Sequence, residues 1–249
     1  SEGDSWSWKD QGPSSGFGSR EEDDVSPVIP DAVRLEQDDS SVMGLSAPAQ
    51  ALLRLAKTED QKIALKSIAS EASTSKASTS KAPSTKSRRV IALTGRRGRG
   101  KSTTAGFAIA LLALESEVDT ILVSAPAFEN LRELMQSGRR GLAESGVDVV
   151  EMPGSQDGGF YAILGRPTGR RVVKVQCLLP SEAVSAISAP AILRHYALVV
   201  DEVASIPVPI MRKLLARSPE FMCLSGTVSG CEGTGGALVW KVFETLKKE

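Results

Sequence analysis

The chain has 249 residues, of which 41% are hydrophobic and 4% aromatic, so it can bury the core of one large domain or of two small ones. Thirty Lys and Arg residues balance thirty Asp and Glu residues, without the basic excess that is usual in nucleic-acid-binding proteins. This neutral total hides two parts of the chain with opposite net charge. Residues 1–50 carry eleven acids and three bases, a net charge of −8, and the remainder therefore carries +8. Overall neutrality thus excludes no class of partner.

Other features of the composition do exclude classes of protein. The three cysteines have no CxxC spacing, which argues against a disulfide framework or a zinc site and favours a reducing compartment (Cys177, Cys223 and Cys231). The longest purely apolar run, residues 108–114, is far shorter than the about 20 residues of a membrane helix, and no signal-peptide pattern is present. We therefore expect no membrane association. Because the chain begins with Ser1 rather than Met, we expect a fragment or a processed product.

Composition and periodicity divide the chain into four segments. Residues 1–48, rich in Ser, Gly, Pro and acids, are expected to form a disordered acidic leader. Residues 49–71 have apolar residues at helical spacing, which predicts two short helices, the second capped by Thr58 or Asp60. Residues 72–89 contain two Ser-Thr-Ser-Lys-Ala repeats and no acid, which is typical of a flexible basic linker. Residues 90–249 form the main domain.

In the main domain, short β-branched runs alternate with helical stretches. Strands are expected at 90–94, 120–124, 147–152, 172–176, 197–200 and 221–225, and helices at 101–116, 127–144, 181–189, 207–217 and 236–248. Strands that are nearly continuous hydrophobic runs are buried on both faces. The sequence therefore predicts an α/β fold in which helices sandwich a parallel sheet, with ligands bound at the carboxyl ends of its strands.

A phosphate-binding loop follows the first expected strand. The segment Gly95-Arg-Arg-Gly-Arg-Gly-Lys-Ser102 matches the pattern G-x-x-x-x-G-K-[ST], with a strand before it and a helix after it. Its glycines let backbone N–H groups turn toward phosphate oxygens at the start of a helix. We expect Lys101 to reach the β- and γ-phosphates and Ser102 to ligate Mg²⁺. The nucleotide site is expected to comprise Gly95, Arg97, Gly98, Arg99, Gly100, Lys101, Ser102, Thr103 and Thr104, although the arginines of the loop could instead face RNA or solvent.

Two further segments complete a candidate ATPase site. The apolar strand Tyr196–Val200 ends in Asp201, which suits a Mg²⁺ ligand, and Glu202, which would polarise the attacking water. His195, before this strand, is more typical of a surface or packing residue. The segment 225–236 is rich in hydroxyl residues and glycine. It is either a γ-phosphate sensor that includes Thr227 or a glycine-rich loop before the next helix.

These segments together resemble the RNA cytidine acetyltransferases, which form N4-acetylcytidine in tRNA and small-subunit rRNA. The resemblance covers about residues 50–249 and lies in Arg97-Gly-Arg-Gly-Lys-Ser102, Ser124-Ala-Pro126, Glu129-Asn-Leu131, Val200-Asp-Glu-Val-Ala-Ser-Ile-Pro-Val-Pro209 and Glu232-Gly-Thr-Gly235. It implies a RecA-like, helicase-like ATPase module that uses ATP or GTP with Mg²⁺. Lys57-Thr-Glu-Asp-Gln61 resembles a stretch whose glutamine, here Gln61, contacts the nucleotide. Thr227 would then sense the γ-phosphate.

The resemblance also implies properties of a longer protein. Acetyl-CoA would bind an acetyltransferase domain that this chain does not contain. The RNA partner would be tRNA, an 18S rRNA precursor or both, with an adaptor protein and a homodimer as further expected partners. The location would be the nucleolus or nucleus in a eukaryote and the cytoplasm otherwise.

Three positions depart from the family pattern, which leaves two alternatives open. The family has Thr or Ser at Gly226, Tyr at Cys231 and Arg at Gly236. Loss of a fixed positive charge at residue 236 puts the role of that loop in doubt. One alternative is an unrelated nucleic-acid helicase or translocase. The other is a degenerate nucleotide-binding interaction module that does not hydrolyse nucleotide and holds RNA through the basic linker.

Overall fold

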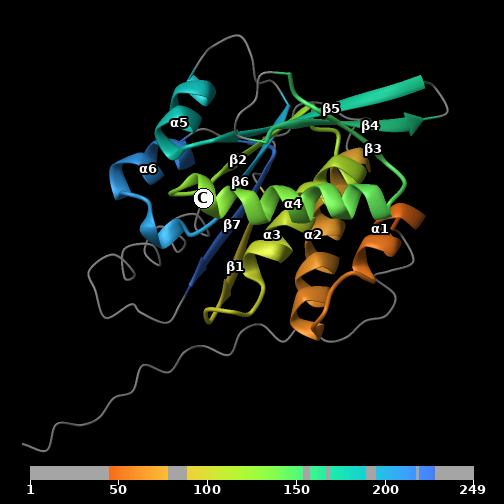
Figure 1. Cartoon of the computed structure of the whole chain (residues 1–249), viewed down its shortest axis with the longest axis horizontal. Coiled ribbons are helices and arrows are strands. Elements are labelled where there is room, and N and C mark those ends of the chain that lie inside the picture. The colour runs from red at the N-terminus through yellow and green to blue at the C-terminus, as the bar shows by residue number, and fades with distance from the viewer. Residues whose placement is uncertain are drawn as a thin grey trace, which may run out of the picture. The chain divides into compact units, whose positions relative to one another are not determined.

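The computed structural model describes residues 45–77, 89–153, 158–166, 169–188, 195–216 and 219–227 (Figure 1). The expected acidic leader, most of the expected linker and the expected helix at 236–248 lie outside these ranges. The described elements are, in chain order, α1 (Ala47–Leu53), α2 (Glu59–Ala77), β1 (Arg89–Gly95), α3 (Lys101–Glu115), β2 (Thr120–Ser124), α4 (Phe128–Glu144), β3 (Asp148–Glu151), β4 (Phe160–Arg166), β5 (Gly169–Leu178), α5 (Pro180–Ser188), β6 (Tyr196–Val200), the 3-10 helix η2 (Val203–Ser205), α6 (Val208–Ala216) and β7 (Phe221–Thr227).

The strands form one sheet of order β1-β7-β6-β2-β5-β4-β3. The first five strands of this order are parallel to one another, and β7 lies between the phosphate-loop strand β1 and the acidic strand β6. With helices on both faces, this arrangement is that of a RecA-like P-loop domain. The expected α/β fold class is therefore confirmed.

At one edge, the predicted parallel sheet is extended by two antiparallel strands. Strand β4, which was not predicted, pairs antiparallel with β5, and β3 pairs antiparallel with β4. Only residues 167 and 168 separate β4 from β5, and so short a connection can join only antiparallel neighbours. The hydrophobic run of residues 147–152 therefore belongs to an edge strand with exposed side chains, Val150 among them, rather than to a strand buried on both faces.

Two hydrophobic clusters lie on opposite faces of the sheet. One face packs against α3 and α4, with α1 and α2 outside them, and the other face packs against α5 and α6 (Figure 1). In β2, Ile121 and Val123 belong to the first cluster and Leu122 to the second. This alternation explains why the central strands read as continuous hydrophobic runs. Helix α3, buried over residues 104–113 between the sheet, α2 and α4, is apolar nearly all round for the same reason.

The helices that precede the sheet are part of this packing. Helix α2 continues to Ala77, several residues into the segment 72–89 that was expected to be a linker. Its C-terminal half is held to α3, because Ala72 is buried and the Ser73 hydroxyl donates to the Glu115 carboxylate as well as to the Ala69 carbonyl oxygen of its own helix. Glu115, only 3% exposed, also accepts a hydrogen bond from the Ser46 hydroxyl at the start of α1. Both N-terminal helices are thus tied to the end of α3.

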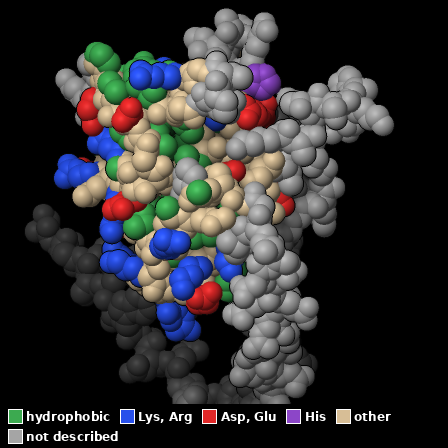
Figure 2. Space-filling view, turned by 90° about the vertical axis from the view of Figure 1, so that its right-hand side faces the viewer, with side chains coloured by type: hydrophobic (Ala, Val, Ile, Leu, Met, Phe, Trp, Pro, Cys, Tyr) green, Lys and Arg blue, Asp and Glu red, His purple; other side chains and the backbone are tan. Residues whose placement is uncertain are grey.

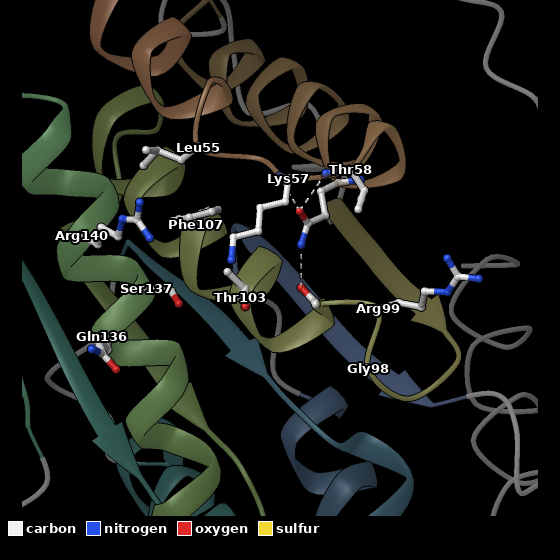
Figure 3. Close-up of a pocket in the computed structure, with 12 residues that line it drawn as sticks. Leu55, Lys57, Thr58, Gly98, Arg99, Thr103, Phe107, Gln136, Ser137 and Arg140 are labelled. Carbon is white, nitrogen blue, oxygen red and sulfur yellow. Dashed lines mark hydrogen bonds between the residues drawn. The ribbon is translucent and has the colours of Figure 1, made fainter.

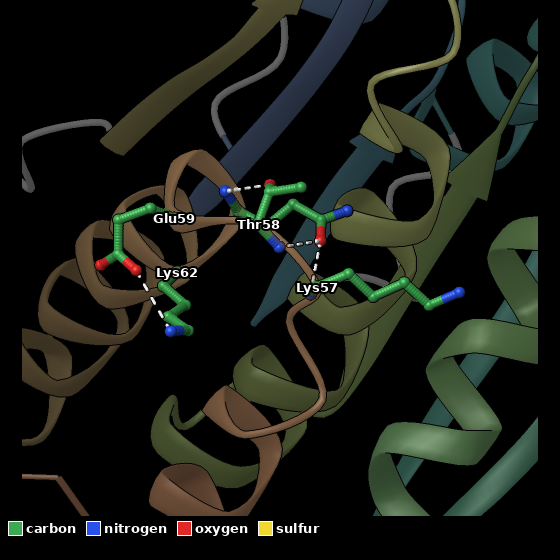
Figure 4. Close-up of polar contacts among 5 residues, drawn as sticks. Lys57, Thr58, Glu59 and Lys62 are labelled. Carbon is green, nitrogen blue, oxygen red and sulfur yellow. Dashed lines mark hydrogen bonds and ion pairs between the residues drawn. The ribbon is translucent and has the colours of Figure 1, made fainter.

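The start of α2 matches its predicted cap. The Thr58 hydroxyl accepts a hydrogen bond from the Gln61 backbone N–H at 3.3 Å, and Glu59 and Lys62 form an ion pair on the exposed face (Figure 4). A hydroxyl at this position satisfies one of the unpaired N–H groups of the first turn. Within the described ranges, no helix combines the length and the apolar character that crossing a bilayer requires.

The crossing of α3 and α4 yields a testable prediction. A Cβ atom at Gly106 would lie 2.5 Å from the Ser137 Cβ and 2.6 Å from the Leu134 carbonyl oxygen. Glycine to alanine normally stabilises a helix interior by about 1 kcal/mol. Here we expect Gly106→Ala to lower the free energy of unfolding by about 2–3 kcal/mol, because the two helices would have to separate. Urea unfolding measures this, with Gly165→Ala as the control, since nothing lies within 4 Å of a Cβ there. Equal effects at the two positions would contradict the proposed close packing.

Candidate nucleotide-binding site

The phosphate loop connects the end of β1 to the start of α3. Gly98 and Gly100 have φ angles of 80° and 72°, in the left-handed region that glycine adopts without strain. Gly100 is the N-cap of α3, and its carbonyl oxygen accepts hydrogen bonds from the backbone N–H and the hydroxyl of Thr104, both at 2.9 Å. The N–H groups of the first turn are left at a helix end that carries a partial positive charge. The loop therefore has the backbone geometry of an anion-binding site.

The side chains of the loop differ in what they contact. The Lys101 ammonium donates to the Arg96 carbonyl oxygen at 3.0 Å, so it bonds to the loop's own backbone. The side chains of Arg96, Arg97 and Arg99 are exposed, and the Arg99 guanidinium extends away from the other labelled side chains in Figure 3. The Thr103 hydroxyl donates to Glu133 at 3.0 Å, a contact between α3 and α4. With the Thr104 hydroxyl bonded to Gly100, both threonine hydroxyls are engaged within the protein.

Parallel pairing brings the acidic segment to the same edge of the sheet as the phosphate loop. Gly95 at the end of β1 is in register with Thr227 at the end of β7, and β6 pairs with the other side of β7. Asp201, directly after β6, is 1% exposed, and its Oδ1 accepts a hydrogen bond from the Ser225 hydroxyl at 2.5 Å. Its backbone N–H donates to the Ser124 carbonyl oxygen at 2.9 Å. Asp201 is thus fixed by the strands on both sides of β6.

The chemistry of Asp201 and Ser102 fits a magnesium ion. The Oδ2 atom of Asp201 is buried and has no hydrogen-bond partner among the described residues. Leaving a buried charged acceptor unpaired is costly, so this oxygen is suited to an added cation or its water. Carboxylate and hydroxyl oxygens are the hard ligands that Mg²⁺ prefers, and in nucleotide sites it keeps waters and phosphates as its other ligands. The described ranges contain no group of three or more His, Cys, Asp or Glu side chains that could hold a metal ion.

Glu202 has a strained backbone. Its φ and ψ angles are 49° and 43°, and among the described residues it is the one non-glycine at positive φ. Such a conformation costs on the order of 1 kcal/mol and persists where the surrounding contacts impose it, often at functional sites. Here it stands between buried Asp201 and the 3-10 helix η2, whose Ser205 N–H donates to the Glu202 carbonyl oxygen at 2.9 Å. At Glu202 the chain therefore turns from the end of β6 into η2.

The thiol of Cys223 lies close enough to this site to sense its charge. Burial, and then the negative charge of Asp201, raise the pKa of the Cys223 thiol from 9.0 to about 12. The thiol is therefore protonated at neutral pH and is not a nucleophile. Cys223 and Cys177 are both free and buried.

A pocket of about 550 Å³ lies next to the phosphate loop (Figure 3). It is bounded by the connection between α1 and α2, the loop itself, and α3 and α4, with the lining Leu55, Lys57, Thr58, Gln61, Gly98, Arg99, Gly100, Thr103, Phe107, Gln136, Ser137 and Arg140. Its volume is in the range of small-molecule sites. Figure 3 shows Lys57 and Arg140 reaching toward Phe107 and Thr103 from two different elements. A pocket of this size beside a phosphate loop can accept the base and ribose of a nucleotide.

The structure places the residues singled out from the sequence as follows. Gln61 reaches the phosphate loop, because its Nε2 donates to the Gly100 carbonyl oxygen at 3.3 Å, 39 residues away. His195 lies before β6, at the opposite end of the strand from Asp201. It is exposed and pairs with Glu220, and Figure 2 shows its imidazole beside acidic side chains.

Sequence reasoning missed Ser225 and the pocket residues Leu55, Phe107 and Arg140. For Ser225 its place in a run of hydroxyl residues was a signal, whereas the pocket residues have none.

One departure from the family pattern has a structural counterpart. A Cβ atom at Gly226 would lie 2.9 Å from the Val203 Cγ2, so β7 passes close to η2 at this residue. Glycine is the residue that permits such an approach. A Thr or Ser here would require Val203 to move. Cys231 and Gly236 lie outside the described residues.

The bond between Ser225 and Asp201 yields a testable prediction. In Ser225→Ala, Oδ1 of the buried Asp201 carboxylate loses its partner, which we expect to lower the free energy of unfolding by about 1–3 kcal/mol. The control is Ser70→Ala on the exposed face of α2, expected to change stability by less than about 0.5 kcal/mol. Chemical denaturation of both variants measures these changes in the free energy of unfolding. A loss at residue 225 no larger than that of the control would show that the bond does not stabilise the fold.

Comparison with known proteins shows which family this chain resembles. The family model described as RNA cytidine acetyltransferase NAT10/TcmA, helicase domain, matches residues 92–249. The RNA cytidine acetyltransferase of Saccharomyces cerevisiae is 28% identical over 238 residues, which cover 92% of this chain and 20% of the relative. The human protein of that name is 30% identical over 172 residues, 65% of this chain and 15% of the relative. The tRNA(Met) cytidine acetyltransferase TmcA of Thermofilum pendens is 29% identical over 170 residues, 66% and 19% of the two chains.

Among solved structures, the large terminase of a thermophilic bacteriophage is similar at 13% identity and a TM-score of 0.45, over 73% of this chain and 39% of that one. The complex of the same terminase with ADP gives 15% identity and the same TM-score, over 68% and 38%. The fold is assigned from the sheet order rather than from this similarity. The chain spans about a fifth or less of the length of the curated relatives named above. By the family match, this chain belongs to the RNA cytidine acetyltransferase family and contains the family's helicase domain.

Proposed function

We propose that the chain binds and hydrolyses ATP or GTP with Mg²⁺, as the helicase-like module of an RNA cytidine acetyltransferase. The observation that supports this most is the shared edge of the sheet. There the phosphate loop after β1 lies at the same edge as Asp201 and Glu202 after β6 and Thr227 at the end of β7. The phosphate loop also borders a pocket large enough for a nucleoside. Each part is found in many proteins, but their combination is that of a nucleotide hydrolase.

Each residue has a proposed task. The N–H groups of residues 98–102 would hold the phosphates, and the Lys101 ammonium would exchange the Arg96 carbonyl oxygen for phosphate oxygens. Ser102 and Asp201 would hold Mg²⁺, which when bound neutralises charge on the β- and γ-phosphates. Glu202 would orient the attacking water, and Thr227 would report the presence of the γ-phosphate. Ser225 would keep Asp201 in position through its bond to Oδ1.

In the whole protein, hydrolysis would be coupled to RNA handling. The relatives are named RNA or tRNA(Met) cytidine acetyltransferases, and this chain corresponds to a small part of each. We propose that the module moves bound RNA so that the target cytidine in tRNA or in an 18S rRNA precursor reaches an acetyl-CoA-binding domain elsewhere in the protein. An adaptor protein, a homodimer and a location in the nucleolus or nucleus are proposed from the family if the source is eukaryotic, and the cytoplasm otherwise. The family match removes the alternative of an unrelated translocase.

Binding and turnover separate the proposed roles. We expect Lys101→Ala to weaken nucleotide binding about tenfold or more, because a charged hydrogen bond to phosphate is lost. We expect Glu202→Gln to bind nucleotide normally but to lower turnover by about 100-fold, because an amide cannot accept the proton of water. Phosphate release and calorimetric titration, with and without RNA, measure the two effects.

The matched control is Glu144→Gln, an exposed acid on α4, which should change neither quantity. Nucleotide binding by the unaltered chain without turnover, with or without RNA, would instead support the non-hydrolysing interaction module. Normal turnover by Glu202→Gln would refute the role given to that carboxylate.

Coupling to acetylation is tested in the full-length protein. If hydrolysis rearranges bound RNA, Lys101→Ala should lower the yield of N4-acetylcytidine in the RNA, measured by mass spectrometry of its nucleosides. The control is Lys213→Ala, an exposed lysine on α6, on the opposite face of the sheet from α3. Acetylation by Lys101→Ala at the level of the unaltered protein would show that the two activities are independent.

A further inference from the structure

The side-chain amide of Gln61 is almost fully bonded within the protein. The residue is 7% exposed. Its Oε1 accepts hydrogen bonds from the backbone N–H groups of Lys57 at 2.8 Å and Thr58 at 3.3 Å, and its Nε2 donates to the Gly100 carbonyl oxygen at 3.3 Å (Figures 3 and 4). These bonds connect the start of α2 to the phosphate loop.

The partners fix which way the amide faces. The two backbone N–H groups require an acceptor, and the Gly100 carbonyl requires a donor, so exchanging oxygen and nitrogen would break all three bonds. An amide oxygen has two lone pairs, and both are used here. One N–H of the amide remains for a ligand. Gln61 therefore has no acceptor to offer to the exocyclic amino group of a base.

The segment of residues 57–61, which carries Gln61, is held in place at both ends. Leu52, Leu53 and Ala56 are buried in the core just before Lys57, and the Thr58 hydroxyl accepts the Gln61 N–H at the start of α2. The main chain of residues 57–61 is thus held by packing on one side and by a helix cap on the other. A side chain anchored in this way can hold the group that it contacts.

The Gln61 side chain contacts Gly100, the last residue of the phosphate loop before Lys101. Gly100 is at φ 72° and begins α3, and a Cβ atom there would lie 2.3 Å from the Gln61 Nε2. The position of the Gly100 carbonyl sets the direction in which the first N–H groups of α3 point. The bond from Gln61 adds to the two that Thr104 donates to this carbonyl within α3, and it ties the carbonyl to a second helix. Fixing the carbonyl before a ligand arrives lowers the entropy that phosphate binding must lose.

Resting on the proposed function, we propose that Gln61 is a positioning residue of the phosphate site: its amide holds Gly100, and hence the phosphate loop, in the binding conformation instead of recognising the base. The proposal differs from the role implied by the family resemblance, in which this glutamine contacts the nucleotide. The two roles make opposite predictions for a ligand that has phosphates but no base.

The experiment compares Mg²⁺·ATP with Mg²⁺·tripolyphosphate in calorimetric titrations of the unaltered chain and of Gln61→Ala. We expect the dissociation constants of both ligands to rise by the same factor, about tenfold, for the loss of the hydrogen bond to Gly100. The number of binding sites should be unchanged, and turnover at saturating ATP should stay within about threefold of the original. Ser70→Ala, an exposed residue on the same helix that does not line the pocket, is the matched control and should leave the binding of both ligands unchanged.

Three outcomes would overturn the proposal. A weaker affinity for ATP with unchanged affinity for tripolyphosphate would show that Gln61 reads the base. A reduced number of binding sites with unchanged dissociation constants, together with a lower melting temperature, would show that it only supports the fold. Unchanged binding of both ligands would show that the bond to Gly100 has no role. Failure of the unaltered chain to bind ATP at all would refute the proposed function itself, which keeps the two hypotheses distinguishable.

Discussion

The parallel pairing of β1, β7 and β6 is the constraint on which the candidate site depends. Because these strands run in one direction, their carboxyl ends meet at a single edge. Every residue proposed for catalysis, except those on α3, lies at the end of one of these strands or directly after it. One strand between β1 and β6 separates the phosphate loop from Asp201 by two strand spacings, about 10 Å. That gap suits a phosphate chain with its metal ion. An antiparallel pairing at any of these strands would carry part of the site to the far edge.

A few close contacts fix the chain where it leaves β6 and β7 at that edge. Gly226 lets β7 pass close to Val203, Ser225 meets Asp201, and Glu202 turns the chain in a left-handed conformation. Each contact joins a strand end to its neighbour. Together they set where the two carboxylates stand relative to the phosphate loop, which neither strand alone could do.

Much of this architecture was readable from the sequence, because local patterns carry it. The limits of β2, 120–124, were predicted to the residue, since a short run rich in β-branched and apolar residues favours a strand. The phosphate loop was readable because its glycines and lysine are adjacent in the chain. Strand β4 was missed although residues 160–164 form a continuous hydrophobic run, in which burial alternates and Tyr161 and Ile163 are only partly buried. The end of α2 was missed because its Ser, Thr and Lys composition is that of a linker, while Ala72 and Ser73 are held by α3, more than 40 residues away in the chain. The limits of the domains beyond that point, and the roles of the site residues, stay predictions.

The packing of α1 and α2 against α3 also bears on where this domain begins as a folding unit. The family match starts at residue 92, within β1. A chain cut there would lack Leu52, Leu65 and Ile68, which are fully buried in the cluster that surrounds α3. The outer side of α3, apolar nearly all round, would then face water, and Glu115 would lose both serine hydroxyls that bond to it. The boundary at which the family is recognisable in sequence is therefore not the boundary at which the domain becomes soluble and stable, and expression of the module should begin before Leu45.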